Sequence, residues 1–246
     1  MRVIIEKNYR EMSRKAALLL SSQLNLKPNS VLGLATGSTP LGMYRELINM
    51  YQHKELDFSE VITFNLDEYY NLSKENEKSY FYYMHNNFFK YVNIPSENIH
   101  FLNAQAENIV EECKTYEEKI KQAGGLDLQI LGIGPNGHIG FNEPGKTLNV
   151  ATHLVNLSEE TIRANSRFFN SINEVPHQAI SIGMAAIMKA RRILLLANGK
   201  NKAEAIEKTV SGYLDTKYPA SILQTHPEVT VIIDEEAARL IKKDNS

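Results

Sequence analysis

Residues 30–40 read Ser-Val-Leu-Gly-Leu-Ala-Thr-Gly-Ser-Thr-Pro, an apolar run followed by a turn. The run at 30–35 predicts a buried strand, because a short apolar stretch bounded by turn residues is typical of a strand covered on both faces. Thr39 and Pro40 predict the start of a helix to about Gln52, with the threonine as N-cap and the proline at the first helical position. This strand–turn–helix unit is the building block of α/β folds.

The same unit recurs along the chain. Helices are expected at 9–24, 79–91 and 107–122 and after residues 198 and 233, and strands at 3–5, 61–66, 126–134, 192–197 and 229–233. Strands separated by helices at this spacing favour an α/β fold with an open, mainly parallel sheet and helices on both faces.

The chain is expected to form one domain. Its 246 residues suit a single α/β catalytic domain spanning 1–246 better than two full domains. No internal repeat and no linker rich in proline, glycine or serine divides it. The segment at about 150–180 is less regular, and we expect it to form an excursion from the main sheet that acts as a lid.

The composition argues against several classes of protein. The formal net charge is -2 and no basic stripe is present, so we expect no nucleic-acid partner. No segment approaches the roughly 20 apolar residues that span a bilayer, and the N-terminus has no leader-like run, so we expect no membrane association. The single cysteine, Cys113, excludes an intramolecular disulfide and is expected to be a small apolar helix residue. These features predict a cytoplasmic protein.

Polar residues follow the predicted strands, at the edge where open α/β sheets bind ligands. The first such segment, Thr36-Gly37-Ser38-Thr39-Pro40, is a turn that feeds a helix N-terminus and exposes backbone N–H groups. Three hydroxyls add donors, so the segment suits a phosphate group. It is neither a Walker A loop nor a dinucleotide fingerprint. A helix cap without a ligand is the alternative.

The second segment is Phe64-Asn65-Leu66-Asp67-Glu68-Tyr69-Tyr70. Two adjacent carboxylates just past an apolar strand can lie at the floor of a pocket, where one of them can act as a base toward a carbon acid. A solvated loop in which Asp67 caps a turn is the alternative.

The third segment, residues 132–145, is the strongest signal in the chain. Its sequence is Gly-Ile-Gly-Pro-Asn-Gly-His-Ile-Gly-Phe-Asn-Glu-Pro-Gly. The five glycines and two prolines predict a tightly folded loop whose backbone lies very close to a neighbouring group. It holds His138, which can move protons both ways near neutral pH, and Glu143, which can orient the imidazole. Because His138 lacks partners at zinc-ligand spacing, we expect acid–base chemistry and no metal.

Three cations complete the candidate set. Arg163 and Arg167 lie in the irregular segment, and Lys202 opens the helix after 197. A guanidinium fork and a lysine at a helix N-terminus suit a sugar phosphate. Each of them alone is more typical of a surface charge. Because the turn at 36–40 also suits a phosphate, the cations and the turn together support a phosphate site.

Together these segments resemble the glucosamine-6-phosphate deaminase family over nearly the whole chain. The His–Glu loop is very specific, whereas the phosphate turn alone would not be. The points of resemblance are Thr36-Gly37-Ser38-Thr39-Pro40, Phe64-Asn65-Leu66-Asp67-Glu68-Tyr69, Gly137-His138-Ile139-Gly140-Phe141-Asn142-Glu143-Pro144-Gly145, Ala164-Asn165-Ser166-Arg167-Phe168-Phe169 and Asn201-Lys202-Ala203.

The resemblance implies a Rossmann-like fold and a hydrolase that acts on a carbon–nitrogen bond. Its reaction would convert glucosamine-6-phosphate to fructose-6-phosphate and ammonia in the catabolism of amino sugars such as N-acetylglucosamine, without a metal or cofactor. Asp67 matches the base for enolisation, His138 the group that opens the pyranose ring, and Glu143 its partner. The phosphate grip matches Gly37, Ser38, Thr39, Arg167 and Lys202, with Thr36 beside them.

The sequence departs from the family at two points. Some members carry an aspartate where this chain has Asn136, which is expected to orient His138 but to hold its imidazolium form less strongly. Allosteric, hexameric members bind N-acetylglucosamine-6-phosphate through basic residues shortly after the His–Glu loop. The corresponding stretch, 146–155, is depleted in basic residues. We therefore expect a non-allosteric enzyme that is a monomer or a homo-oligomer.

Two other functions are the alternatives. A 6-phosphogluconolactonase resembles this chain in its Gly-His loop, but it hydrolyses an ester and needs no carbon-acid base. A non-catalytic sugar-phosphate sensor would bind the ligand without turnover and would need no His–Glu loop.

Overall fold

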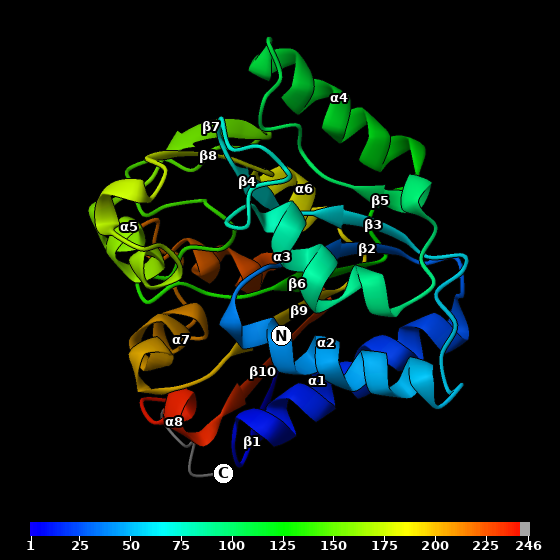
Figure 1. Ribbon diagram of the computed structural model, residues 1–246. Coiled ribbons are helices and arrows are strands. Elements are labelled where there is room, and N and C mark those ends of the chain that lie inside the picture. Colours follow the sequence, from blue (N-terminus) through cyan, green and yellow to red (C-terminus); the bar gives the residue numbers. More distant parts are fainter. Residues whose placement is uncertain (242–246) are drawn as a thin grey trace.

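The main sheet is fully parallel and forms the centre of the molecule (Figure 1). The computed structural model describes residues 1–241, and within them this sheet has seven strands. Their order across the sheet is β1 (Arg2–Glu6), β10 (Val229–Asp234), β9 (Ile193–Ala197), β6 (Leu128–Leu131), β2 (Val31–Leu34), β3 (Ile62–Asn65) and β5 (Ile99–His100). The predicted α/β fold with a mainly parallel sheet is confirmed.

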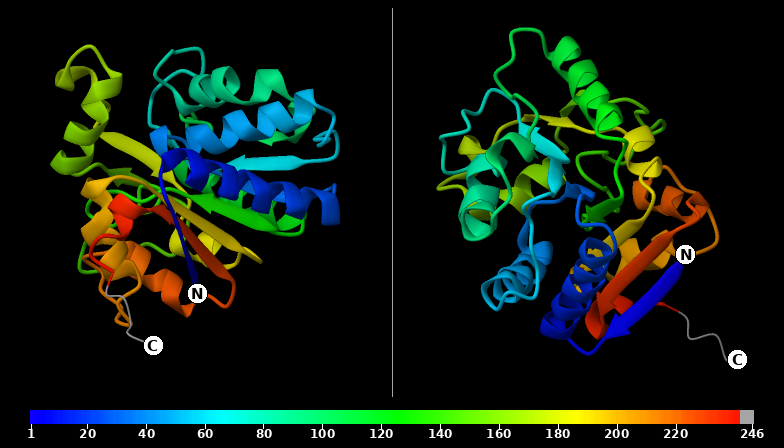
Figure 2. Two further views of the ribbon diagram at one scale, coloured as in Figure 1. Left: turned by 90° about the horizontal axis from the view of Figure 1, so that it is seen from below. Right: turned by 90° about the vertical axis from the view of Figure 1, so that its right-hand side faces the viewer.

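Helices cover both faces of this sheet, as Figure 2 shows. One face packs on α1 (Tyr9–Leu26), α2 (Ser38–Gln52) and α3 (Tyr80–Asn87). The other face packs on α4 (Ile109–Gln122), α6 (Met184–Met188), α7 (Ala203–Thr209) and α8 (Glu235–Ala238). Burial on both sides explains why the central strands β2, β6 and β9 lack exposed residues.

A glycine in β2 permits close packing between neighbouring strands. A Cβ on Gly33 would lie 2.1 Å from Oε1 of the buried Gln129 of β6. Any other residue at this position would displace a side chain from the centre of the sheet.

A second, smaller sheet stands at the carboxyl edge of the first. It has the order β4 (Asp67–Tyr69), β8 (Gln178–Ser181) and β7 (His153–Asn156), with antiparallel pairing. Its own core joins Tyr69, Phe141, Leu157, Ile162, Val175 and Ala179. The alternative of a solvated loop at Asp67 is therefore wrong, because residues 67–69 form a buried strand.

The irregular segment at 150–180 is an excursion from the main sheet. It contains β7, α5 (Glu159–Asn165), two 3-10 turns (Ser166–Phe168 and Ile172–Glu174) and the start of β8. In Figure 1, α5 lies to one side of the main sheet, next to the second sheet. The action of this segment as a lid stays a prediction.

Some local predictions were wrong. The N-cap of α2 is Gly37 rather than Thr39, because the backbone turns there with φ 101° and the helix begins at Ser38. The helix expected at 79–91 divides into α3 and a 3-10 turn, Phe89–Tyr91. The helix after 198 begins as a 3-10 turn, Lys200–Lys202. Across the described part of the chain, no helix is long and apolar enough to cross a membrane.

Asp127 ties β2 to β6 and provides a test of the fold. The buried carboxylate accepts hydrogen bonds from the N–H of Val31 at 2.8 Å and from Lys27 Nζ at 2.7 Å. Replacing Asp127 with Ala should lower the free energy of unfolding by about 2–3 kcal/mol, because a buried N–H loses its acceptor together with an ion pair. Chemical denaturation measures this loss.

The matched control is Glu118→Ala, which removes a carboxylate from an exposed pair with Lys121. It should cost well under about 1 kcal/mol. Equal losses for the two variants would contradict the role given to Asp127.

Candidate active site

A cavity of about 600 Å³ lies where the strands of the main sheet end. It is lined by the residues after β2, by β4, by the loop after β6, by the segment after β7 and by the turn after β9. Arg163, Asn136 and Glu143 do not line the cavity, although the last two contact His138. The cavity brings together the other predicted site residues: Thr36, Gly37, Ser38, Thr39, Asp67, His138, Arg167 and Lys202.

The phosphate-type turn, residues 36–40, is held by side chains of other elements. Tyr83 of α3 donates to the carbonyl of Gly37 at 2.8 Å, and Tyr9 of α1 donates to the carbonyl of Ser38 at 2.8 Å. Thr39 donates to the side chain of Asn198, after β9, at 2.9 Å. With its carbonyls engaged elsewhere, the turn leaves the N-terminus of α2 at the cavity, where it favours an anion.

Two cations face this turn. Arg167 donates to Ser38 Oγ at 3.2 Å, which links the excursion to α2. Burial lowers the pKa of Lys202 to about 8, and the positive charge of Arg167 contributes. Two cations brought close in a partly dry site fit a doubly charged phosphate. Arg163 is not part of the site, because it pairs with Glu159 at 3.1 Å on the exposed surface.

The adjacent carboxylates of β4 point to different places, as successive strand residues do. Asp67 faces the cavity but is only 8% exposed, and a Cβ on Gly140 would lie 3.5 Å from its Oδ2. Burial, with the charge of Glu68 second, raises the pKa of Asp67 to about 8. Such a carboxyl group accepts a proton readily once it is ionised.

Glu68 has a structural role and holds backbone N–H groups. It accepts hydrogen bonds from the N–H groups of Tyr69, Tyr80 and Phe81, each at 2.9 Å, and so fixes the start of α3. Burial raises the pKa of Glu68, and these three donors oppose that rise.

The glycine-rich loop after β6 places His138 at the cavity wall. A Cβ on Gly134 would lie 2.3 Å from the imidazole, so the loop needs glycine there. Nδ1 of His138 lies 3.7 Å from Glu143 Oε2. Asn136 accepts from the N–H of His138 and donates to Glu143 Oε2, both at 3.2 Å.

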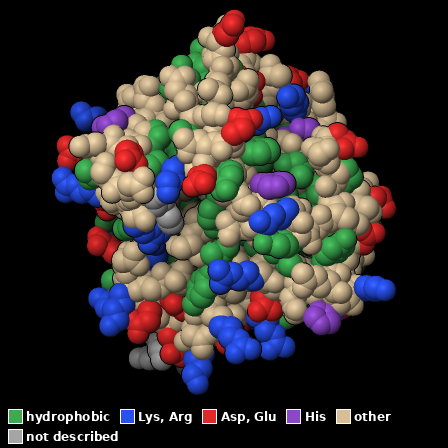
Figure 3. Space-filling view, in the orientation of Figure 1, with side chains coloured by type: hydrophobic (Ala, Val, Ile, Leu, Met, Phe, Trp, Pro, Cys, Tyr) green, Lys and Arg blue, Asp and Glu red, His purple; other side chains and the backbone are tan. Residues whose placement is uncertain are grey.

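The charge on His138 is set by opposing groups. Burial lowers its pKa most, Glu143 raises it and Lys202 lowers it. The neutral imidazole is thereby favoured, which is the form that can take a proton. On the face of the molecule shown in Figure 3, acidic and basic side chains are interspersed.

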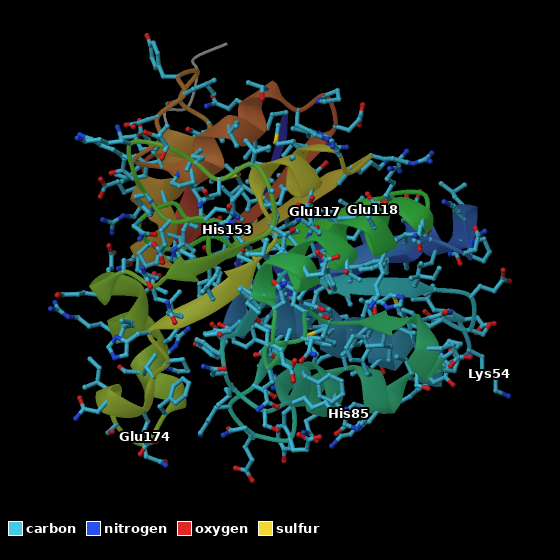
Figure 4. All side chains as sticks on the ribbon, turned by 90° about the horizontal axis from the view of Figure 1, so that it is seen from above. Lys54, His85, Glu117, Glu118, His153 and Glu174 are labelled. Atoms are coloured by element: carbon cyan, nitrogen blue, oxygen red, sulfur yellow. The ribbon has the colours of Figure 1, made fainter. Side chains whose placement is uncertain are left out.

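The remaining histidines do not line the cavity. Figure 4 labels two of them, His85 on α3 and His153 on β7. In residues 1–241, no group of three or more His, Cys, Asp or Glu side chains comes together in a way that could hold a metal ion.

Several site residues were missed from the sequence. Ser158 and Thr161 contact Glu143, and Asn198 and Tyr83 hold the turn at 36–40. Each lies 15 or more residues from its partner along the chain, so local pattern gave no signal for them.

Comparisons with known proteins show the family of the chain. The family of glucosamine-6-phosphate isomerases/6-phosphogluconolactonase matches residues 6–232. A glucosamine-6-phosphate deaminase from Halothermothrix orenii is 68% identical over 241 residues, which cover 98% of this chain and 100% of that protein.

Solved structures give the same result. A monomeric glucosamine-6-phosphate deaminase superposes with a TM-score of 0.95 at 44% identity, covering 98% of this chain and 100% of that one. A 6-phosphogluconolactonase from Thermotoga maritima gives 0.75 at 21% identity, covering 95% and 99%, and shows a shared fold alone. The chain belongs to the glucosamine-6-phosphate isomerase/6-phosphogluconolactonase family.

Proposed function

We propose that this protein converts glucosamine-6-phosphate to fructose-6-phosphate and ammonia. One observation carries the proposal: the buried carboxyl of Asp67 and the imidazole of His138, which lies beside Glu143, line the same cavity as the turn at 36–40 and its two cations. Named deaminases that align with nearly the whole chain support it.

Phosphate binding would position the substrate. The N-terminus of α2, Arg167 and Lys202 converge on one end of a sugar phosphate, which leaves the sugar to reach Asp67 and His138. Binding energy from a group remote from the reacting carbons then supplies orientation.

Ring opening would use His138. The closed sugar exposes its aldehyde when the O1 proton leaves and O5 gains a proton. A neutral imidazole can take the first proton and return it to O5 as an acid. Glu143 stabilises the imidazolium form between these two transfers.

Enolisation and loss of ammonia would use Asp67. Its carboxylate takes the C2 proton of the open-chain sugar and returns it to C1. Over the same step the aldehyde oxygen O1 gains a proton and the ammonium group at C2 loses one, so C1 carries a hydroxyl and C2 becomes an iminium carbon. Water adds to that carbon, the C–N bond breaks and ammonia leaves, so the net reaction consumes one water as a hydrolase does. A lactonase needs no base at a carbon, so the position of Asp67 favours the deaminase.

Further assignments belong to the same proposal. The monomeric relative supports a monomer. The depletion of basic residues at 146–155 favours an enzyme without allosteric activation. A role in amino-sugar catabolism in the cytoplasm and independence from metals and cofactors follow from the reaction proposed.

The first experiment treats the protein with EDTA, adds glucosamine-6-phosphate, and follows ammonia and fructose-6-phosphate together. Equal appearance of both supports the proposal. Tight binding of the substrate without products would support a sensor, and turnover of 6-phosphogluconolactone alone would support the lactonase.

The base is tested by Asp67→Asn. We expect a loss of kcat of about 10²- to 10⁴-fold, because the amide cannot accept the C2 proton. The same variant should be more stable than the wild type at pH 8. The folded pKa of Asp67, about 8, lies above its ordinary value, so the wild type loses stability as pH rises from about 4 to about 8. Thermal unfolding at several pH values measures this, and equal pH dependence of the two proteins would contradict the burial of this charge.

The second test concerns Asn136→Asp. An aspartate would add a negative charge beside His138 and raise the pKa of its imidazolium. NMR titration of His138 should therefore move to higher pH, and the acid side of the pH–rate profile should change with it. Superimposable titrations and profiles would show that the neutral amide does not set the charge of His138.

The phosphate grip is tested by Lys202→Gln. A hydrogen bond between charged groups contributes about 1.5–3 kcal/mol to binding. Its loss should raise KM about 10- to 100-fold. Lys200→Gln is the matched control, because Lys200 lies 3.7 Å from Glu236 on the exposed surface. Equal KM values for the two variants would remove Lys202 from the phosphate site.

A further inference from the structure

His138 and Glu143 are too far apart to share a direct hydrogen bond. Nδ1 of the imidazole lies 3.7 Å from the nearer carboxylate oxygen, beyond the roughly 3.5 Å within which a hydrogen bond can form. The hydroxyl of Thr161 lies close to both groups. Its Oγ1 is 2.5 Å from Glu143 Oε1 and 3.5 Å from His138 Nδ1.

Thr161 is held in this place by its own helix. It is 2% exposed, lines the cavity and belongs to the first turn of α5. Its N–H donates to the hydroxyl of Ser158, the N-cap, at 3.2 Å. The neighbouring Ile162 packs in the core of the second sheet, which fixes the helix against the loop that carries Glu143.

The directions of the hydrogen bonds follow from the available protons. An ionised Glu143 only accepts, so the hydroxyl proton of Thr161 points to Glu143 Oε1. Thr161 Oγ1 has two lone pairs: the hydroxyl of Ser158 can donate to one of them at 3.1 Å, and the other remains to accept from His138 Nδ1–H at 3.5 Å. A proton on Nδ1 leaves Nε2 of the neutral imidazole as an acceptor.

We propose that Thr161 is a positioning residue for ring opening, whose hydroxyl bridges Glu143 and His138 and holds the imidazole in the tautomer protonated at Nδ1. The assignment of a step to this residue rests on the proposed function, whereas the bridge itself is a property of the protein. Thr161 touches the acid–base pair and acts on the substrate through it.

The same helix also leads into the phosphate site. Arg167 follows α5 in the chain and donates to Ser38 of the phosphate-type turn. A substitution that merely displaced α5 would therefore weaken phosphate binding. Loss of the bridge alone would lower kcat and leave KM unchanged, so the two effects can be separated.

The test compares Thr161→Val, Thr161→Ser and a control, Thr209→Val. Thr209 is a buried threonine in α7 whose hydroxyl donates to the carbonyl of Ala205 within its own helix. We expect Thr161→Val to lower kcat about 10- to 100-fold, as removal of a histidine's orienting partner does. Thr161→Ser should restore kcat, and Thr209→Val should match the wild type.

A spectroscopic measurement tests the bridge without turnover. The ¹⁵N spectrum of the imidazole at neutral pH should show His138 protonated at Nδ1 in the wild type and in Thr161→Ser. In Thr161→Val, the signal should shift toward a mixture of the two tautomers.

Two results would overturn the proposal. One is a Thr161→Val protein with wild-type kcat and an unchanged ¹⁵N spectrum. The other is a raised KM at constant kcat, which would show that Thr161 only supports Arg167. If the wild type itself failed to release ammonia from glucosamine-6-phosphate, the proposed function would fall, and the ¹⁵N spectra would still decide the bridge.

Discussion

The structure depends on the passage of the chain from one sheet to another at Leu66. The N–H of this residue donates to Leu34 in the parallel sheet, and its carbonyl accepts from Ile182 beside the antiparallel sheet. The next residue, Asp67, is consequently buried where the two sheets meet, at the floor of the cavity. The hydrogen bonds of one residue thus join the two sheets and place a carboxyl group at the site.

Burial gives Asp67 its chemistry and costs stability. Removal from water raises its pKa to about 8, far above that of an exposed aspartate. Such a group destabilises the folded protein when it is ionised, and it persists where the surrounding structure holds it. Glu68, the next residue, has three backbone donors and fixes α3, so two neighbouring carboxylates serve different purposes.

The sequence predicted the parallel sheet because its strands are apolar runs next to helices. Most of the site residues that it predicted line the cavity, because strand ends share one edge of such a sheet. The antiparallel sheet was missed. Its strand β4 is three residues long and begins with two acids, so it does not show the alternation of apolar and polar residues that is typical of a strand. Thr161 was missed because its role depends on α5 packing against a loop 18 residues away along the chain.

The most direct test of the account uses glucosamine-6-phosphate that carries deuterium at C2. The account predicts a slower reaction with this substrate, part of the deuterium at C1 of the fructose-6-phosphate, and a kcat about 10²- to 10⁴-fold lower in Asp67→Asn. Deuterium transfer at the wild-type rate in Asp67→Asn would contradict it, since another group would then move the C2 proton.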